Sequence, residues 1–172
     1  HMPHLFKTQK QMDEKTLPSP ELKLNLLRQS IDQLTRAGYV YIGMDHFAKP
    51  DDSLYLAQQK KQLHRNFQGY STRSECDLIG FGVSSISSIG DSFVQNHKDI
   101  ETYYQSIDNQ QLPTRCGVTL TPDDVVRREI ISQLICHFEL DISSIESKFN
   151  LNFDAYFQSE LEEIRLLALD GL

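Results

Sequence analysis

The sequence predicts an α/β fold whose last third is entirely helical. Leucine and isoleucine residues at helical spacing follow Ser19-Pro20-Glu21 and stop at Gly38. The next residues, 39–42 (YVYI), form a β-branched and aromatic run that suits a short, buried parallel strand. A helix, a glycine and a strand in succession are typical of α/β proteins. From Thr121 onward the apolar residues have helical spacing only, so we place a domain boundary near residue 112.

Composition and charge indicate a soluble protein without a membrane or nucleic-acid partner. Of the 172 residues, 39% are hydrophobic and 24% are charged, as in soluble globular proteins. No uncharged apolar stretch approaches the roughly 18 residues that a membrane span needs, so we expect no membrane partner. The formal net charge of −7 repels a phosphate backbone, so we expect no nucleic-acid partner either.

The three cysteines argue against a metal centre built by this chain. Cys76, Cys116 and Cys136 are 40 and 20 residues apart, which fits neither a disulfide framework nor CxxC metal spacing. We expect three buried thiols in a reducing cytoplasm.

The middle of the chain alternates turn signals with short apolar runs. We expect a loop over residues 43–47, then a helix that starts at Asp51-Asp52 and continues to about Leu63. Residues 67–70 predict a turn or short strand, and residues 78–86 a strand. A hairpin turn is expected at residues 88–91, followed by a short helix that carries Tyr103, Tyr104 and Ile107.

The helical region has three predicted helices. Thr121-Pro122-Asp123-Asp124 starts the first, with a core-facing stripe at Val126, Ile130, Leu134 and Phe138. Asp141 caps the second, and the third runs from Phe153, with Phe157, Leu161, Ile164 and Leu167 on one side. These helices resemble the front of a winged helix without its wing, so we expect the chain to be truncated at both ends. Residues 141–172 hold seven acids against Lys148 and Arg165, which argues against DNA binding.

Two stretches are candidates for chemistry. Asp45-His46 follows the first predicted strand, where ligands collect in open sheets; a turn cap and a structural histidine are the alternative. Residues 78–90 carry four serines, three glycines and no charge. Such a stretch lets backbone approach a flat ligand closely, with Phe67 and Ile86 to cover one face. The alternative is an ordinary bent strand, and Gly80-Phe81-Gly82 lacks the third glycine of a dinucleotide motif.

Several sequence blocks resemble one enzyme family. They are Pro3-His4-Leu5-Phe6-Lys7, residues 42–52 (IGMDHFAKPDD), residues 64–70 (HRNFQGY) and residues 82–87 (GVSSIS). The family is the bacterial oxygen-independent coproporphyrinogen III oxidases, which are radical S-adenosylmethionine enzymes of haem biosynthesis. The resemblance implies that residues 3–111 are the end of a partial radical-SAM β/α barrel and residues 112–172 a helical, winged-helix-like subdomain.

The resemblance also implies cofactors and roles. The complete enzyme is expected to hold a [4Fe-4S] cluster and two molecules of S-adenosyl-L-methionine, and to receive electrons from a donor protein in the cytoplasm. It is expected to decarboxylate the propionate side chains of coproporphyrinogen III, giving protoporphyrinogen IX through 5′-deoxyadenosyl radical chemistry. Phe67, Gln68 and Ile86 correspond to residues that line the second S-adenosylmethionine site. Asp45 and His46 are candidate catalytic residues facing the same cavity.

One departure and two rival interpretations remain. The family's CxxxCxxC motif is absent from this sequence, so we expect this chain alone to be inactive. The first rival is a haem-chaperone-like paralogue that binds haem without turnover. The second is a non-catalytic winged-helix interaction module.

Overall fold

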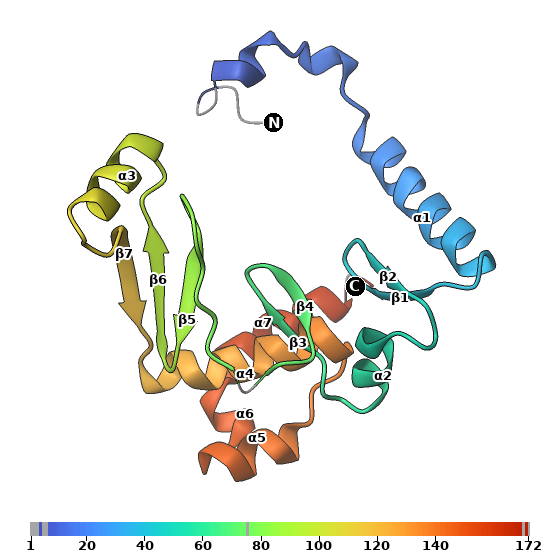
Figure 1. Cartoon of the computed structure of the whole chain (residues 1–172). Coiled ribbons are helices and arrows are strands. Elements are labelled where there is room, and N and C mark those ends of the chain that lie inside the picture. The colour runs from blue at the N-terminus through green and yellow to red at the C-terminus, as the bar shows by residue number, and fades with distance from the viewer. Residues whose placement is uncertain (1–3, 5–6, 75, 170, 172) are drawn as a thin grey trace. The chain divides into compact units, whose positions relative to one another are not determined.

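The computed structural model describes residues 4, 7–74, 76–169 and 171 (Figure 1). Contacts within the chain divide it into two compact units, His1–Tyr55 and Leu56–Leu172. Part of the Pro3–Lys7 block and of the predicted end of the last helix (residues 3, 5, 6, 170 and 172) lies outside the described residues. Within the described part of the chain, no helix combines the length and the hydropathy that crossing a membrane requires.

The first unit contains the predicted helix–glycine–strand succession. Two short 3-10 helices, η1 (Lys7–Gln11) and η2 (Glu14–Thr16), precede helix α1 (Pro20–Arg36). The Ser19 hydroxyl caps α1 by accepting a hydrogen bond from the Leu22 backbone N–H at 3.2 Å. Gly38 follows the helix with a left-handed φ of 82°, a conformation that favours glycine. The predicted helix and its end are confirmed.

Strand β1 is present, but its predicted parallel pairing is wrong among the described residues. Strand β1 (Val40–Gly43) turns at Met44-Asp45 and pairs antiparallel with β2 (His46–Ala48). The reversal needs a left-handed residue, and Met44 adopts a φ of 53° there. Ile42 is fully buried in this hairpin. The predicted loop over residues 43–47 is therefore a tight turn that places His46 within a strand.

Helix α2 (Ser53–Gln59) is shorter than predicted. Asp52 starts it by accepting a hydrogen bond from the Leu54 backbone N–H at 2.8 Å. Lys61 then takes a left-handed φ of 54°, and the Gln62 N–H closes the helix on the Ala57 carbonyl. A left-handed residue cannot continue an α-helix, so the predicted extension to Leu63 is wrong.

The second unit contains a hairpin and a three-stranded antiparallel sheet. The hairpin consists of β3 (His64–Asn66) and β4 (Gly69–Ser71). The sheet has the order β5–β6–β7, with β5 (Ile86–Ile89), β6 (Ser92–Asn96) and β7 (Thr114–Thr119), and helix α3 (Ile100–Asp108) connects the last two. The turn at residues 88–91 and helix α3 are confirmed. Strand β7 is missing from the sequence-based prediction, so residues 112–172 are not entirely helical.

The predicted strand over residues 78–86 is wrong for most of its length. Leu78 forms one isolated bridge with Ser88, and a regular strand begins only at Ile86. Gly82 and Ser84 have left-handed φ angles of 96° and 58°, so the chain cannot stay extended between them. Residues 79–85 therefore form a loop that reverses the chain before β5.

The helical region begins as predicted. In α4 (Pro122–His137), the Thr121 hydroxyl and the Asp124 carboxylate form a reciprocal capping box. Asp141 caps α5 (Ile142–Phe149) by accepting a hydrogen bond from the Ser144 N–H at 3.0 Å. The third predicted helix is split into α6 (Phe153–Tyr156) and α7 (Gln158–Leu169).

A small core joins these helices. Its fully or almost fully buried members are Val126, Ile145, Phe153 and Phe157, and partly buried apolar residues pack around them: Ile130, Leu140, Phe149, Leu151 and Leu161. The predicted stripe is therefore confirmed at its beginning only. Leu134 and Phe138 on α4, and Ile164 and Leu167 on α7, are exposed.

Candidate functional site

One face of the three-stranded sheet carries the predicted residue Ile86. Directly paired residues of antiparallel strands place their side chains on the same face. The register pairs Ile86 with Gln95 and Gln95 with Cys116, and it pairs Ser88 with Phe93 and Phe93 with Val118. We call this surface the Ile86 face; it comprises Ile86, Ser88, Phe93, Gln95, Cys116 and Val118.

Phe67 reaches the Ile86 face from the neighbouring hairpin. Its ring meets the Phe93 ring edge to face, with centroids 5.4 Å apart and an interplanar angle of 89°. Aromatic pairs prefer this geometry because the positive ring edge meets the negative ring face. The structure thus brings Phe67 and Ile86, which are 19 positions apart in the sequence, to one largely apolar surface.

The turn that carries Phe67 and Gln68 is built by Asn66. The Asn66 side-chain oxygen accepts hydrogen bonds from the backbone N–H groups of Gln68 (2.8 Å) and Gly69 (3.2 Å). This Asx turn leaves both intervening side chains exposed, and Phe67 retains 61% of its accessible surface. An exposed aromatic ring beside an exposed amide is suited to binding a flat, polar-edged ligand.

Helix α4 holds this hairpin in place. The Tyr70 hydroxyl donates a hydrogen bond to the Ile135 carbonyl at 3.2 Å. The Arg65 guanidinium lies over the Tyr70 ring, 5.0 Å from its centroid. Because Arg65 and Tyr70 are a cross-strand pair, the contact also fixes the register of β3 and β4.

Asp45 and His46 lie on the β1–β2 turn of the first unit. The Asp45 carboxylate is 2.8 Å from the His46 Nδ1 atom, and Asp45 is almost fully exposed. The contact places a carboxylate and an imidazole next to each other at this turn. The other three predicted residues belong to the second unit. The catalytic role of Asp45 and His46 stays a prediction, as does its structural alternative.

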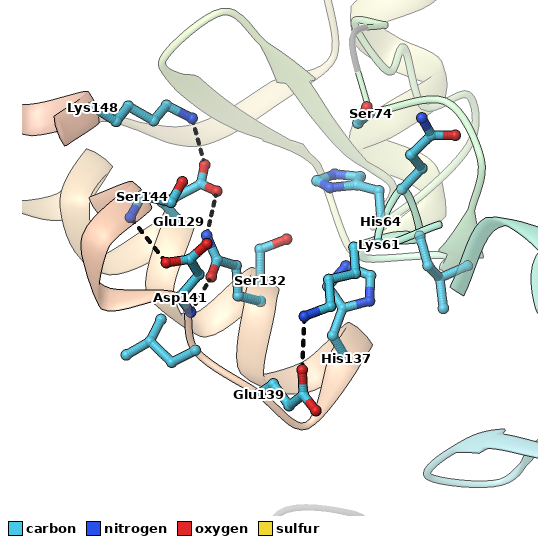
Figure 2. Close-up of a pocket in the computed structure, with 14 residues that line it drawn as sticks. Lys61, His64, Ser74, Glu129, Ser132, His137, Glu139, Asp141, Ser144 and Lys148 are labelled. Atoms are coloured by element: carbon cyan, nitrogen blue, oxygen red, sulfur yellow. Dashed lines mark hydrogen bonds and ion pairs between the residues drawn. The ribbon is translucent and has the colours of Figure 1, made fainter. Parts of the chain in front are cut away.

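A second feature of the Leu56–Leu172 unit is a polar pocket of about 470 Å³ (Figure 2). Its walls come from the segment after α2, from Ser74, from α4 and from the start of α5. The lining residues are Lys61, Gln62, Leu63, His64, Ser74, Glu129, Ser132, Gln133, His137, Glu139, Leu140, Asp141, Ser144 and Lys148. None of the five predicted site residues is among them. Sequence reasoning missed this pocket because its walls come from separate segments without a shared motif.

Both lysines of this pocket are paired with carboxylates. Lys61 Nζ contacts Glu139 and Lys148 Nζ contacts Glu129, each at 2.7 Å, as Figure 2 shows. The hydrogen bond from Lys61 lowers the pKa of Glu139. Burial, and then the nearby Lys61 charge, lower the pKa of His137. The lining holds two lysines against three carboxylates, so one negative charge remains, that of Asp141, which caps α5.

The cysteines do not fit an iron–sulfur cluster. Such a cluster needs several thiolates close together, but no group of three His, Cys, Asp or Glu side chains placed to hold a metal occurs in the described part of the chain. Cys136 is buried, and its burial raises the pKa of the thiol. Cys76 and Cys116 are exposed, so the prediction of three buried thiols is wrong for two of them.

The fold and the helical region agree with a known protein class. Residues 120–172 match the family described as the HemN C-terminal domain. The solved structure of coproporphyrinogen III oxidase (HemN) from Escherichia coli, a radical SAM enzyme, aligns with a TM-score of 0.93 and 49% identity. The alignment covers 100% of this chain and 40% of that one.

Curated relatives give the same result over the whole chain. The oxygen-independent coproporphyrinogen III oxidases of Salmonella typhimurium and Pseudomonas aeruginosa are 48% and 50% identical to it. Both alignments include 100% of this chain, but it spans only 38% and 37% of the relatives' lengths. The chain is therefore similar in sequence and in fold to the C-terminal part of oxygen-independent coproporphyrinogen III oxidases.

Proposed function

We propose that this chain is part of an enzyme that converts coproporphyrinogen III to protoporphyrinogen IX by oxygen-independent oxidative decarboxylation. The observation that carries the proposal is the 48% identity over all 172 residues to enzymes of that name, together with the TM-score of 0.93. Because the chain spans 38% of such a relative, the activity is proposed for the whole protein.

We propose further that the Ile86 face, with Phe67 and Gln68, binds one of two S-adenosyl-L-methionine molecules. The exposed Phe67 ring offers a surface on which an adenine can stack, and Ile86 offers apolar contact beside it. The Gln68 amide can donate and accept hydrogen bonds at the polar edge of the ligand. When bound, S-adenosyl-L-methionine supplies the chemistry that removes hydrogen from a propionate side chain of the substrate.

The residues of this chain would act by positioning and by excluding water. Phe67, Phe93 and Ile86 form an apolar wall with few groups that compete with the substrate in a hydrogen-transfer step. On the other unit, the Asp45 carboxylate lies 2.8 Å from His46 Nδ1, so the two groups could act together on a substrate. We keep Asp45 and His46 as the candidate catalytic pair on this geometry.

Other parts of the proposal concern the whole protein. Residues 3–111 would complete a radical-SAM barrel, and residues 112–172 would form the C-terminal subdomain. The [4Fe-4S] cluster would take its thiolates from outside this chain, because the three cysteines of this chain do not form a group that could hold a metal. We propose a cytoplasmic enzyme that receives electrons from a donor protein.

The proposal is tested with the full-length protein, purified without oxygen. It is supplied with coproporphyrinogen III, S-adenosyl-L-methionine and a reductant, and porphyrins are measured by fluorescence after oxidation. We expect protoporphyrin to accumulate together with 5′-deoxyadenosine. Stoichiometric haem binding without porphyrinogen turnover would instead identify a haem-chaperone-like protein and overturn the proposal.

A further inference from the structure

We infer that Asn96, at the end of β6, is a positioning residue that fixes the loop before Ile86 and so orients Ile86 toward bound S-adenosyl-L-methionine. The inference deepens the proposed function and rests on its assignment of Ile86. Asn96 belongs to none of the sequence blocks that carry the family resemblance. The role of Asn96 is inferred from its hydrogen bonds to the loop.

A single amide nitrogen of Asn96 holds three points of the loop. Asn96 Nδ2 lies 2.9 Å from the Ser85 hydroxyl oxygen, 3.0 Å from the Gly82 carbonyl oxygen and 3.5 Å from the Gly80 carbonyl oxygen. Asn96 is partly buried, and so are Gly80, Gly82 and Ser85. The Gly82 carbonyl also accepts from the Ser85 hydroxyl at 2.8 Å, so the amide adds the Gly80 carbonyl to an existing contact. A partly buried carbonyl that loses a donor retains a desolvation cost, so this amide makes one loop conformation preferable to others.

Further hydrogen bonds hold the outgoing arm of the loop (residues 79–82) and its returning arm (residues 83–85). The Ser84 N–H donates to the His97 carbonyl at 2.8 Å, and the Asn96 N–H donates to the Ser85 carbonyl at 3.0 Å. The Gly82 N–H donates to the Tyr103 hydroxyl of α3 at 3.2 Å. Backbone bonds thus fix the returning arm of the loop, whereas the carbonyls of the outgoing arm at Gly80 and Gly82 accept from the Asn96 side chain.

The loop packs directly against the peptide that starts β5. A Cβ atom on Gly80 would lie only 2.9 Å from the Ile86 carbonyl oxygen and 3.0 Å from the Ser85 Cβ. Glycine is therefore required at this position for the outgoing arm to approach Ile86. A shift of the outgoing arm changes the support of the Ser85 side chain and of the Ile86 carbonyl, and with it the direction of the Ile86 side chain.

The Asn96 amide has the donors that are needed to hold these three oxygens. Asparagine supplies two N–H groups and can share them among the three oxygens. An aspartate of the same shape supplies none when ionised, and its charge repels the Gly80 and Gly82 carbonyls. Asn96→Asp therefore removes the function while keeping the side-chain volume.

The test compares Asn96→Asp and Asn96→Ala with Ser92→Ala in the full-length protein. Ser92 lies on the same strand and makes an exposed hydrogen bond with Thr119 at 3.2 Å, away from the loop. Two quantities are measured: the equilibrium dissociation constant for S-adenosyl-L-methionine, and the amide hydrogen exchange of residues 80–86. We expect both Asn96 variants to weaken binding by about tenfold, the effect of losing roughly one hydrogen bond, and to speed exchange in the loop. Ser92→Ala is expected to leave both quantities unchanged.

Faster exchange with unchanged affinity would show that Asn96 is merely structural and would overturn the inference. Unchanged exchange in Asn96→Asp, which folds with the same side-chain volume, would overturn it as well. If the unaltered protein itself neither binds S-adenosyl-L-methionine nor converts coproporphyrinogen III, the proposed function fails instead. The two failures are therefore distinguishable.

Discussion

Phe67 is an aromatic residue whose position is fixed although most of its surface is exposed. Its neighbour Asn66 shapes the turn, and the Phe93 ring supports one edge of the Phe67 ring. An exposed aromatic residue contributes little to stability, because it buries little surface on folding. We therefore propose that this exposed ring serves binding more than stability.

We predict that Phe67→Ala weakens S-adenosyl-L-methionine binding while the melting temperature hardly changes. Losing an aromatic contact worth about 0.5–1.5 kcal/mol raises the dissociation constant by roughly two- to tenfold. Phe138→Ala is the matched control, because Phe138 is 62% exposed against 61% for Phe67 but lies at the end of α4. Equal effects of the two substitutions on binding would contradict the assignment.

His137 gives the fold a pH dependence. Its pKa lies below its ordinary value of 6.5, because burial and the Lys61 charge disfavour the protonated form, while Glu139 opposes this shift. The unfolded chain therefore binds a proton more readily than the folded chain does. The contribution of His137 to stability is present above pH 6.5 and is lost as the pH falls below it.

We predict that His137→Gln reduces this dependence. Urea unfolding midpoints at about pH 7.5 and pH 5.5 should differ less in the variant than in the unaltered protein. The window lies above the range in which the salt-bridged carboxylates titrate, since the pKa values of Glu129 and Glu139 lie below 4.5. An equally large pH difference in the variant would exclude His137 as its source.

At the scale of elements, the caps and turns carry most of the information that sequence reasoning can use. Ser19, Thr121 and Asp141 cap their helices as predicted, because capping depends on neighbours within three positions. The turn at Gly90-Asp91 is confirmed for the same reason. Hydrogen bonds between residues close in the sequence, such as those of caps and turns, can therefore be predicted from the sequence itself.

Pairings between distant segments could not be predicted in the same way. Strand β7 has exposed residues throughout, and its alternation of apolar and polar side chains is limited to Cys116 and Val118, with Gly117 between them, which is too short a pattern to predict a strand. The loop at residues 79–85 depends on Asn96, 11 positions beyond its last residue. The contact of Phe67 with Phe93 likewise joins two separate hairpins. Phe67 and Ile86 were predicted from the family resemblance, while Phe93, Asn96 and the polar pocket required the structure.

The helical core leads to a prediction at the scale of elements. Ile145 on α5 is fully buried among Val126, Phe153 and Phe157. Replacing it with alanine removes three carbons from the core and should lower the free energy of unfolding by about 2–5 kcal/mol. Chemical denaturation measures this change.

Ile164→Ala is the control for Ile145→Ala, because Ile164 is 56% exposed on α7. Its unfolding free energy should fall by no more than about 1 kcal/mol. Equal losses from both substitutions would mean that these helices do not pack around Ile145 as described.

At the scale of the whole molecule, we propose that the chain supplies one part of a larger enzyme. It spans 38% of a relative's length, and its cysteines do not assemble a cluster site. What it offers is a shaped, mostly apolar wall on an antiparallel sheet, anchored to α4 through Tyr70 and to α3 through Tyr103. Under the proposed function, the wall would position the reactants and the cofactors would perform the bond chemistry.

The central claim is that the Ile86 face guides hydrogen removal from the substrate. The most direct test is the ratio of S-adenosyl-L-methionine consumed to vinyl groups formed by the full-length enzyme, measured for the unaltered protein and for Ile86→Ala. We predict that the ratio rises in Ile86→Ala, because a truncated side chain leaves the reacting groups poorly aligned and lets cleavage occur without productive transfer. An unchanged ratio would contradict the claim.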